Sequence, residues 1–427
     1  MTTTSLASSV HPLLPYEVQP GRLLLASGVR AGDWIFASGL LPTRFGATAR
    51  PLSGEPAWTI QCRSVWERAQ AVLAAGGTDL AHLVRCDQFL PDWRAMPFFH
   101  AVRREVCGAH IPPSTSVLEA GVLVPEAAVT MHLVAVAPGG PALLPLFPPG
   151  LAVPATSSFV PVMQAGGVVF VAGLLAAHGE GDLGGIAPEA QVPEGHLWKG
   201  QRIQLELAYL LRHKLGPALT AAGSSLARVV KADVAITDLR EVPAFNQVWA
   251  QAFDGAVPAT TFVPTVQPGL AIADARLEIT LVALCDDRPA ERIAVAEALP
   301  TVCDGHAVAM RAGDLLFFSG MVAADAQGLV ERARIDPRQP YYGSSIEAQM
   351  EYLLAVADAV CRQAGTSLAN VVRIQQMHTD LREFYPACQV WHRRLPGVPL
   401  PLAAFQVPAP LLVPGCTVQL DLWVYVP

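Results

Sequence analysis

The chain has 427 residues, of which 52% are hydrophobic and 15% charged, and its formal net charge at pH 7 is −7. A chain of this length is expected to fold as two to four domains, and no apolar run approaches the ~18–20 residues that a membrane span requires. The negative charge, with only three lysines and no basic patch, argues against a nucleic-acid partner.

The cysteines and the first residues bear on where the protein works. Eight cysteines are scattered along the chain without a CxxC pair, so we expect neither a metal site nor a disulfide framework. Residues 1–15 lack a positively charged leader before their apolar part, which argues against a secretory signal. We therefore expect a cytoplasmic protein that uses no metal and no cofactor.

The first third of the chain predicts a simple order of elements. Apolar residues at helical spacing indicate the first helix, and Gly76-Gly77 mark its end. The expected elements are a strand at 32–42 that ends on Ser38-Gly39, a helix at 58–75, a strand at 82–90, a helix from just after Asp92 to near Gly108, and strands at 112–121 and 129–138.

The same order of parts returns twice, about 140 residues apart each time. Residues 236–249 (ITDLREVPAFNQVW) and 378–391 (HTDLREFYPACQVW) are closely similar, and 89–102 (FLPDWRAMPFFHAV) is a more divergent copy. Self-similarity at a fixed period indicates an internal repeat, so we expect three copies of one domain. The expected ranges are 1–140, 156–285 and 300–427, joined by short links at 138–155 and 285–300.

Each copy has the predicted order β-β-α-β-α-β-β, an α+β design with one mixed sheet and both helices on a single face. The last strand alternates apolar and polar residues, as a half-buried strand does. The apolar residues expected to face the helices are Val129, Met131, Leu277, Ile279, Val418 and Leu420. The polar residues on the other face are Thr130, His132, Glu278, Thr280, Gln419 and Asp421. If three sheets close around a common axis, these polar positions line internal clefts.

These parts, in this order, resemble the RidA/YjgF family of reactive-intermediate deaminases, which hydrolyse imines and enamines to 2-oxo acids and ammonia. The resemblance covers essentially the whole chain, three times. Its most specific segments are the Ser/Ala-Gly strand end, Ala-Ala-Gly-x-Ser/Thr-Leu-x-x-Val-Val, and Thr-Asp-Leu. Family members are homotrimers of a chorismate-mutase-like fold, so the resemblance implies an intramolecular pseudo-trimer that is monomeric or weakly dimeric in solution.

The resemblance also assigns residues to the family's ligand clefts, which lie between neighbouring subunits. The arginine that grips the substrate carboxylate falls on Ser114, Thr260 and Ala403. The glutamate that positions a water falls on Thr130, Glu278 and Gln419, and the asparagine of the second helix on His100, Asn246 and Cys388. The tyrosine near the start of the family's domain falls on Leu25, Phe159 and His306, and the backbone glycine of the cleft matches Gly173.

Only the second copy keeps both the glutamate and the asparagine, so Glu278 and Asn246 are the expected catalytic residues. Glu278 would act as a general base toward water, and the rival interpretation is a salt-bridged residue between domains. Asn246 could equally cap a helix. The expected substrate-binding residues are Arg276, Thr260, Gly173, Phe159, His306, His100 and His132.

Further features of the sequence leave alternatives open. Arg276 lies two residues before Glu278, so that both would share one strand face, where Arg276 either grips an acidic group or pairs with Glu278. Each histidine has a purely structural role as its alternative. The insertion at 178–200 is either a lid over a site or a surface excursion.

The leading hypothesis is an enzyme that acts on a small imine, enamine or related metabolite, by hydrolysis or deamination, in a degenerate site without the family arginine. Because neither Thr nor Ala replaces a bidentate Arg–carboxylate contact, little or no activity on 2-aminoacrylate is expected. The alternatives are a repurposed biosynthetic enzyme similar to the chorismatases, and a non-catalytic pseudo-trimer that binds a small molecule. A cyanuric-acid-hydrolase-like architecture would need a Ser-Lys pair in each repeat, which three lysines do not provide.

Overall fold

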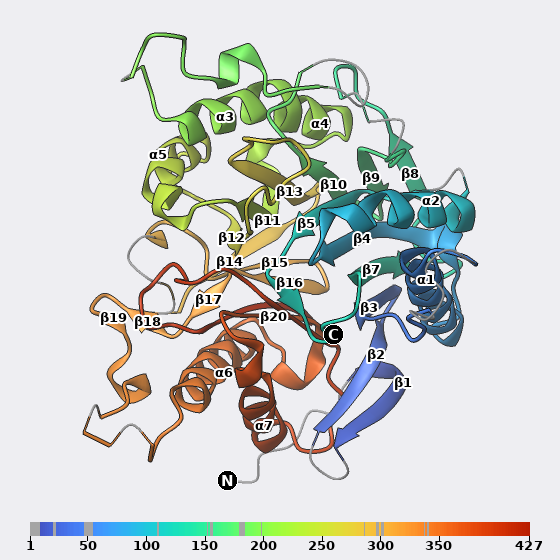
Figure 1. The fold of residues 1–427 in the computed structure, drawn as a ribbon, viewed down its shortest axis with the longest axis vertical. Coiled ribbons are helices and arrows are strands. Elements are labelled where there is room, and N and C mark those ends of the chain that lie inside the picture. The colour runs from blue at the N-terminus through green and yellow to red at the C-terminus, as the bar shows by residue number, and fades with distance from the viewer. Residues whose placement is uncertain are drawn as a thin grey trace.

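The computed structural model describes most of the chain and is drawn in Figure 1. The described residues are 9–19, 23–46, 54–108, 111–151, 153, 157–178, 184–197, 199–285, 287–295, 299, 303–336, 338–339 and 341–427. Within these ranges no helix combines the length and the apolar character needed to cross a membrane.

The first copy folds into a six-stranded sheet in the order β1-β2-β3-β7-β4-β5. Its strands are β1 (Val10–Gln19), β2 (Leu23–Ala31), β3 (Trp34–Leu40), β4 (Leu83–Leu90), β5 (Ser114–Leu118) and β7 (Thr130–Val136), and its helices are α1 (Ala57–Ala75) and α2 (Met96–Cys107). Only the pair β4–β5 is parallel in this sheet. A parallel pair requires a crossover connection, which α2 provides.

The second copy repeats this sheet in the order β8-β9-β10-β13-β11-β12, again with one parallel pair, β11–β12. Its strands are β8 (Leu143–Leu146), β9 (Val162–Ala165), β10 (Val168–Leu174), β11 (Val229–Ile236), β12 (Ala259–Pro264) and β13 (Leu277–Leu284). Its helices are α3 (Arg202–Leu210), α4 (Gly216–Ala221) and α5 (Val242–Ala252), and a π-helical segment at Leu211–Leu215 joins α3 to α4.

The third copy has the same strand order once more, β14-β15-β16-β22-β20-β21. Its strands are β14 (Ala290–Ile293), β15 (Ala309–Ala312), β16 (Leu315–Phe318), β20 (Val371–His378), β21 (Leu402–Gln406) and β22 (Val418–Tyr425), with α6 (Ser345–Gln363) and α7 (Phe384–Arg394) as its helices. The short strand β17 (Met321–Val322) also pairs with β22, and β18 (Ala324–Asp325) pairs with β19 (Gly328–Leu329). The mixed α+β class and the repetition of one domain design are therefore confirmed.

Short 3₁₀ turns precede several of these elements. They lie at Leu80–His82, Trp93–Ala95, Pro188–Ala190, Leu226–Arg228, Leu239–Glu241, Glu331–Ala333, Leu368–Asn370 and Leu381–Glu383. Three of them begin the second helix of a copy, and there the Asp of the repeated motif accepts a hydrogen bond from the backbone N–H two residues later, as Asp238 does from Arg240 at 2.9 Å. The repeated motif thus starts a helix, because its carboxylate satisfies a backbone donor that the first turn leaves unpaired.

The structure corrects the expectation that the regions between copies are only links. β8 lies in the first expected link and β14 in the second, and each forms the outer strand of the following sheet, as β1 does in the first copy. Proline and charged residues made these segments unlike central strands. Proline is compatible with an edge strand, however, because its missing N–H can face away from the ladder, and Pro145 occupies such a place in β8.

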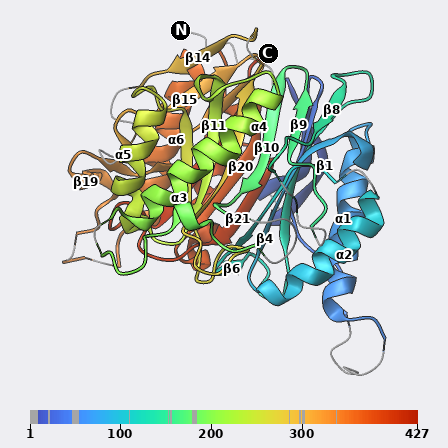
Figure 2. The same ribbon diagram turned by 90° about the horizontal axis from the view of Figure 1, so that it is seen from above.

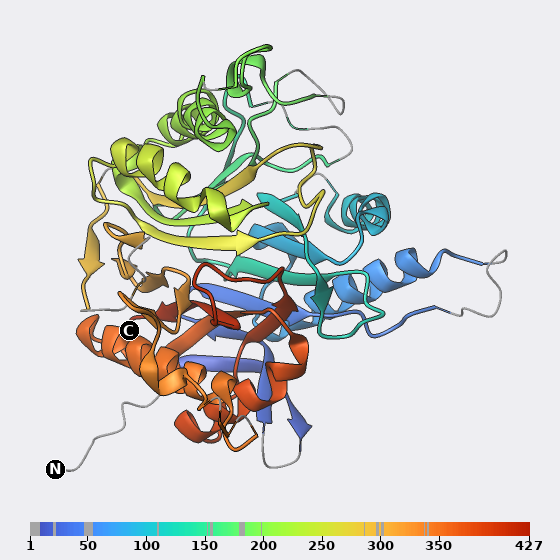
Figure 3. The same cartoon turned by 60° about the vertical axis from the view of Figure 1, so that its left-hand side comes forward.

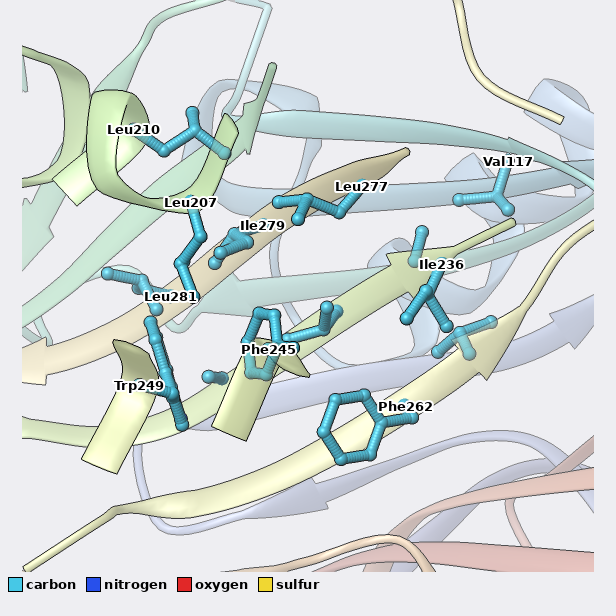
Figure 4. Packing of buried hydrophobic residues seen from close by; sticks show 14 of the residues in the cluster. Val117, Leu207, Leu210, Ile236, Phe245, Trp249, Phe262, Leu277, Ile279 and Leu281 are labelled. Carbon is cyan, nitrogen blue, oxygen red and sulfur yellow. The ribbon is translucent and has the colours of Figure 1, made fainter. Parts of the chain in front are cut away.

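Helices cover one face of each sheet, where the apolar residues of the last strand are buried. Val129 and Met131, Leu277 and Ile279, and Val418 and Leu420 belong to three separate helix-covered clusters, as their alternation predicts. Figure 4 shows this packing in the second copy, where Leu207 and Leu210 of α3 lie over the strand that carries Leu277, Ile279 and Leu281.

The opposite faces of the three sheets meet in the middle of the molecule. A further buried cluster contains residues of all three sheets, including Phe36, Phe170, Phe317 and Trp423. The Trp423 ring centroid lies 4.7 Å from that of Phe317 and 6.3 Å from that of Phe36 in the first copy. The helices α1 and α2 and the helices α3 and α5 accordingly lie on different sides of the strands (Figure 2).

The first and third copies also exchange backbone contacts. The two-residue strand β6 (Gly121–Val122) follows β5 in the chain but pairs with β21, so the first copy adds the outermost strand to the third sheet. Ala26 of β2 donates from its backbone N–H to the carbonyl of Leu400 at 2.9 Å, and β2 lies beside α7 (Figure 3).

A closed set of buried charges joins the three copies, and we call it the ion ring. It consists of Arg85, Asp87, Lys231, Asp233, Arg373 and Asp421. Arg85 Nη2 lies 2.6 Å from Asp233 Oδ2 of the second copy, and Lys231 Nζ lies 3.0 Å from Asp421 Oδ2 of the third. Burial favours the neutral form of Asp233, but Lys231, Arg85 and Arg373 together hold its pKa below the usual range. Three cations balance three carboxylates, so the centre carries no net charge.

Candidate active site

A cleft of about 720 Å³ lies between the first and second copies. Its walls come from α2 and β5 of the first copy and from β10 and β13 of the second, with parts of the connection between the copies. Most lining side chains are apolar, among them Trp93, Met96, Phe159, Leu174 and Leu270. An apolar cleft of this size with a few polar groups is the usual form of a small-molecule site.

Glu278 faces this cleft from β13 and is 4% exposed. Its carboxylate lies directly on Gly173 of β10, where an added Cβ would stand 1.9 Å from Oε1. Any side chain at position 173 would therefore displace the Glu278 carboxylate. Thr115 of the first copy donates its hydroxyl to Oε1, so two copies build the surroundings of this carboxylate.

The pKa of Glu278 is raised to about 7. Burial is the main cause, because it disfavours the charged carboxylate, and the hydrogen bond from Thr115 acts in the opposite direction. The negative charge of Asp87 adds a smaller upward effect. A carboxyl group that titrates near neutral pH can both accept and donate a proton in one reaction cycle.

Arg103 of α2 borders the same cleft and is completely buried. Its Nη1 donates to Ser114 Oγ at 2.7 Å and its Nη2 to the carbonyl of Ser157 at 2.6 Å, whereas Nε has no hydrogen-bond partner in the described part of the chain. None of the described carboxylates forms an ion pair with it. Burial lowers its pKa. Because a buried charge without a counter-ion is costly, the guanidinium would be stabilised by an anion in the cleft.

Arg103 stands where the other two copies have tryptophan. Trp249 and Trp391 occupy the equivalent helix position, and their indole N–H groups donate to Thr260 Oγ1 at 3.3 Å and to Gln376 Oε1 at 3.0 Å. Arg103 was not among the predicted site residues, because the family arginine was expected on the strand at Ser114. Comparing the repeats position by position would have shown that a buried indole is replaced by a cation in one copy.

His100 also lines the cleft from α2. Its pKa is lowered to about 3, first by burial and then by the charges of Arg103 and Arg104. His100 is therefore neutral at physiological pH and offers one donor and one acceptor. The structure thus brings four of the expected site residues to a single cleft, and they are Glu278, Gly173, Phe159 and His100.

The corresponding place between the second and third copies holds the other expected residues. Asn246 Oδ1 lies 3.0 Å from His306 Nε2, and the backbone N–H of Thr260 bonds to Ser319 Oγ at 2.8 Å. Asn246 does not share the cleft of Glu278, because the two residues of the second copy face different neighbouring copies. The pKa of His306 is lowered to about 4, first by burial and then by the charge of Arg292, so its imidazole is neutral at physiological pH and bonds to Asn246.

Apolar residues occupy the same place between the third and first copies. Leu25, Cys388 and Leu402 are each at most 4% exposed there. The strand register corrects one assignment: Ile374 pairs with Leu402 as Cys86 pairs with Ser114, so the family arginine position falls on Leu402 and not on Ala403.

Two expected binding residues lie elsewhere. Arg276 precedes β13, and its Nη1 lies 3.5 Å from Glu241 Oε2 while its backbone N–H donates to Glu206, so it turns to the helix side and away from Glu278. His132 is buried where the copies meet, with its ring centroid 5.7 Å from that of Phe89. Burial holds the pKa of His132 well below its usual range.

The insertion at 178–200 borders the cleft through His178 and Gly184. The backbone N–H of His178 donates to the carbonyl of Gly185 at 3.0 Å. Residues 179–183 and 198 lie outside the described residues, so neither the lid nor the surface excursion is tested over that part. Among the residues that are described, no group of three or more His, Cys, Asp or Glu side chains is arranged to hold a metal ion.

The fold and the cleft define a protein built from repeated α+β domains with its candidate site between two copies. The model of the family described as endoribonuclease L-PSP matches residues 24–137 and 150–285, which is more than half of the chain. The protein therefore belongs to this family, the family of the RidA and YjgF proteins. No curated protein sequence matches the chain.

The solved structures with similarity to this chain include members of this family and a chorismatase. RidA from an Antarctic Psychrobacter is 26% identical, covers 32% of this chain and 99% of its own, and has a TM-score of 0.26. A member of the YjgF/YER057c/UK114 family from Mycobacterium tuberculosis is 19% identical over 26% of this chain and 86% of its own, with a TM-score of 0.23. A chorismatase is 11% identical, covers 81% of this chain and 93% of its own, and has a TM-score of 0.48.

Proposed function

We propose that the protein is an enzyme that hydrolyses an imine or enamine of a 2-oxo acid in the cleft between its first and second copies. One observation carries this proposal. Glu278, whose pKa is raised to about 7, faces the same apolar cleft as Arg103, a buried cation without a carboxylate partner among the described residues. A proton-transfer group and an uncompensated positive charge suit a reactant that carries both a carboxylate and a C=N bond.

The reaction would use Glu278 twice. In the first step, a water oxygen bonds to the iminium carbon, the C=N π electrons move to nitrogen, and the Glu278 carboxylate takes a proton from the water. In the second step, Glu278 returns the proton to the amine nitrogen, the C–N bond breaks with its electron pair going to nitrogen and a C=O bond forms, and the hydroxyl proton passes to the departing ammonia to give ammonium. The products are a 2-oxo acid and ammonium, and Glu278 is regenerated.

The substrate carboxylate would bind over the hydroxyls of Ser114 and Ser116, which line the cleft. Arg103 stands directly behind Ser114, at 2.7 Å from its Oγ, so its charge acts through a low-dielectric wall. This arrangement supplies positive charge from a helix where family members use a strand arginine. We still expect weak activity on 2-aminoacrylate, because so small a molecule would fill little of a cleft of about 720 Å³. Imines with larger apolar side chains fit better.

A coupled assay tests this proposal. Imines are generated by an amino-acid oxidase from leucine, phenylalanine and methionine, and release of the 2-oxo acid is measured against the uncatalysed rate in buffer. Wild-type protein should accelerate release, and Glu278→Gln should lower turnover at least ~100-fold, because a general base typically contributes 10²–10⁴-fold. The Tm should be unchanged or higher.

The repeat provides matched controls for this assay. Thr130→Ala and Gln419→Ala change the residues at the equivalent strand positions, and they should leave turnover within about threefold of wild type. Arg103→Trp installs the residue that the other copies have, and it should raise KM at least ~10-fold with the fold intact. A fully active Glu278→Gln variant, or a wild type no faster than buffer on every imine, would refute the proposed activity.

A further inference from the structure

The first helix of the second copy contains one more residue than its counterparts. Gln61, Glu206 and Gln349 hold the same place in the three copies, since each accepts a hydrogen bond from the backbone just before the last strand, at Ala128, Arg276 and Thr417. The end of α1 at Ala75 lies 14 positions after Gln61, and the end of α6 at Gln363 lies 14 positions after Gln349. The end of α4 at Ala221 lies 15 positions after Glu206.

The extra residue is absorbed in the π-helical segment Leu211–Leu215. A π-helical turn widens the helix locally and changes the direction of its side chains, and such turns are frequent at functional sites. The equivalent helices α1 and α6 are continuous α-helices over 19 residues each. The second copy therefore departs from the common helix in the part that reaches the candidate active site.

Lys214 lies in this π-helical segment and lines the cleft. Its Nζ donates to the carbonyl of Gly150 at 3.0 Å, and partial burial lowers its pKa. Within the described chain it forms no ion pair with a carboxylate. A half-buried ammonium with one carbonyl partner keeps two N–H donors for a ligand.

The charges around the cleft are unequal. Arg103, Arg104 and Lys214 line it, whereas Glu278 is its only acidic lining residue in the described part of the chain. Arg103 comes from the first copy and Lys214 from the second, so the two cations approach from different walls. A single substrate carboxylate near Ser114 would neutralise the charge of Arg103. Lys214 would then still lack an anionic partner.

We propose that Lys214 binds a second acidic group of the substrate, so that the natural substrate carries two acidic groups separated by an apolar spacer. This inference rests on the proposed function for the first carboxylate, which binds near Ser114 and Arg103. The apolar lining between the walls suits the spacer, and Lys214 reaches the cleft from the π-helical segment. Lys214 is thus a specificity-determining residue and takes no part in proton transfer.

Binding of unreactive product analogues tests this inference. The affinities of 2-oxoglutarate, 2-oxoadipate and 2-oxopimelate are compared by calorimetry with those of 2-oxopentanoate, 2-oxohexanoate and 2-oxoheptanoate, in which a methyl group replaces the second carboxylate. For at least one chain length, wild-type protein should bind the diacid about tenfold more tightly or better, as expected for a charge-assisted hydrogen bond. The preference should weaken as salt is added.

Variants then locate the preference. Lys214→Met should abolish it and leave affinity for the monoacids within about twofold, while Lys214→Arg should retain part of it. Lys199→Met is the matched control, because Lys199 is exposed and outside the cleft. Equal affinities of the wild type for both members of every pair, or an unchanged preference in Lys214→Met, would overturn the inference. Turnover by Glu278→Gln is measured separately, so failure of the proposed reaction would be recognised independently of diacid binding.

Discussion

At the scale of single residues, the hydrogen bond between Thr115 and Glu278 allows us to predict how the reaction rate depends on pH. If the Glu278 carboxylate is the base, kcat/KM should rise with pH and reach half its maximum near pH 7, where this group titrates. The Thr115 hydroxyl stabilises the charged form, so Thr115→Val should move the midpoint to higher pH. pH–rate profiles of both proteins check this. A midpoint that stays fixed or moves to lower pH in Thr115→Val would show that Glu278 is not the group whose titration controls the rate.

The burial of Glu119, which follows β5, leads to a second prediction, about how stability depends on pH. Glu119 is 1% exposed, neither carboxyl oxygen has a hydrogen-bond partner in the described structure, and burial raises its pKa well above the ordinary value. The folded state therefore binds a proton that the unfolded state has released above about pH 4.5. Stability is fully present below that pH and decreases as pH rises toward the folded pKa, by up to ~1.4 kcal/mol per pH unit.

Glu119→Gln should remove this part of the pH dependence. Urea unfolding at pH 5 and pH 8 should give similar free energies for the two proteins at the lower pH and a more stable variant at the higher pH. A variant that shows the same loss of stability between pH 5 and pH 8 as the wild type would show that Glu119 is not the group responsible.

The sequence predicted where Glu278 lies in the fold but did not predict the place of Arg103, for a physical reason. Strand alternation places Glu278 on the open face of the sheet whatever packs there, and burial followed from the expected meeting of three sheets. Arg103 lies in a charged stretch, Arg103-Arg104-Glu105, that resembles a solvent-facing helix surface. Its burial depends on the connection between the copies, which covers it with Ser157, and a helical pattern does not contain that information.

At the scale of elements, the middle strands β4, β11 and β20 each carry a buried cation at the same position, and the ion ring depends on them. Lys231 of β11 bonds to Thr261 Oγ1 at 2.6 Å, to the carbonyl of Phe318 at 2.7 Å and to Asp421 at 3.0 Å. Lys231→Met should lower the free energy of unfolding by about 3–5 kcal/mol, because it leaves buried carboxylates uncompensated. Denaturant unfolding with an unchanged m-value measures this.

The surface variant Lys199→Met is the control for that measurement and should change stability by less than about 0.5 kcal/mol. A loss below about 1 kcal/mol in Lys231→Met would mean that the ring tolerates a missing cation. The ring itself was not predicted, since each cation also pairs with an aspartate of another copy. The third copy has Gln375 where the others have Asp87 and Asp233, and its aspartate, Asp421, comes from the last strand.

Helices and strands were predicted well where the pattern of their own residues determines them. They were predicted poorly where packing against neighbouring strands determines them. The helix expected at 58–75 is α1 at Ala57–Ala75, because apolar spacing and a glycine stop act within the segment. The edge strands β8 and β14 are defined by the strands they join, and their own residues give little periodicity. The π-helical segment follows from one inserted residue, which is recognisable only after Gln61, Glu206 and Gln349 are matched through their hydrogen bonds.

At the scale of the whole molecule, we propose that the three copies do within one chain what three subunits do in a trimer. All three sheets contribute to one buried cluster, and β6 crosses from the first copy to the third sheet. These junctions leave no trimer interface to fill, so light scattering should give the mass of one chain, or at most a weak dimer that dissociates on dilution. A stable mass near three chains would contradict this proposal.

Covalent linkage also changes how such a protein can evolve. In a homotrimer every substitution appears at three symmetric sites at once, so a change that creates one new cleft must be tolerated in all of them. Here the position of Arg103 holds tryptophan in the other two copies, at Trp249 and Trp391. In a single chain the three positions can differ, and here two hold a tryptophan that bonds within its own copy while the third holds a cation beside the cleft.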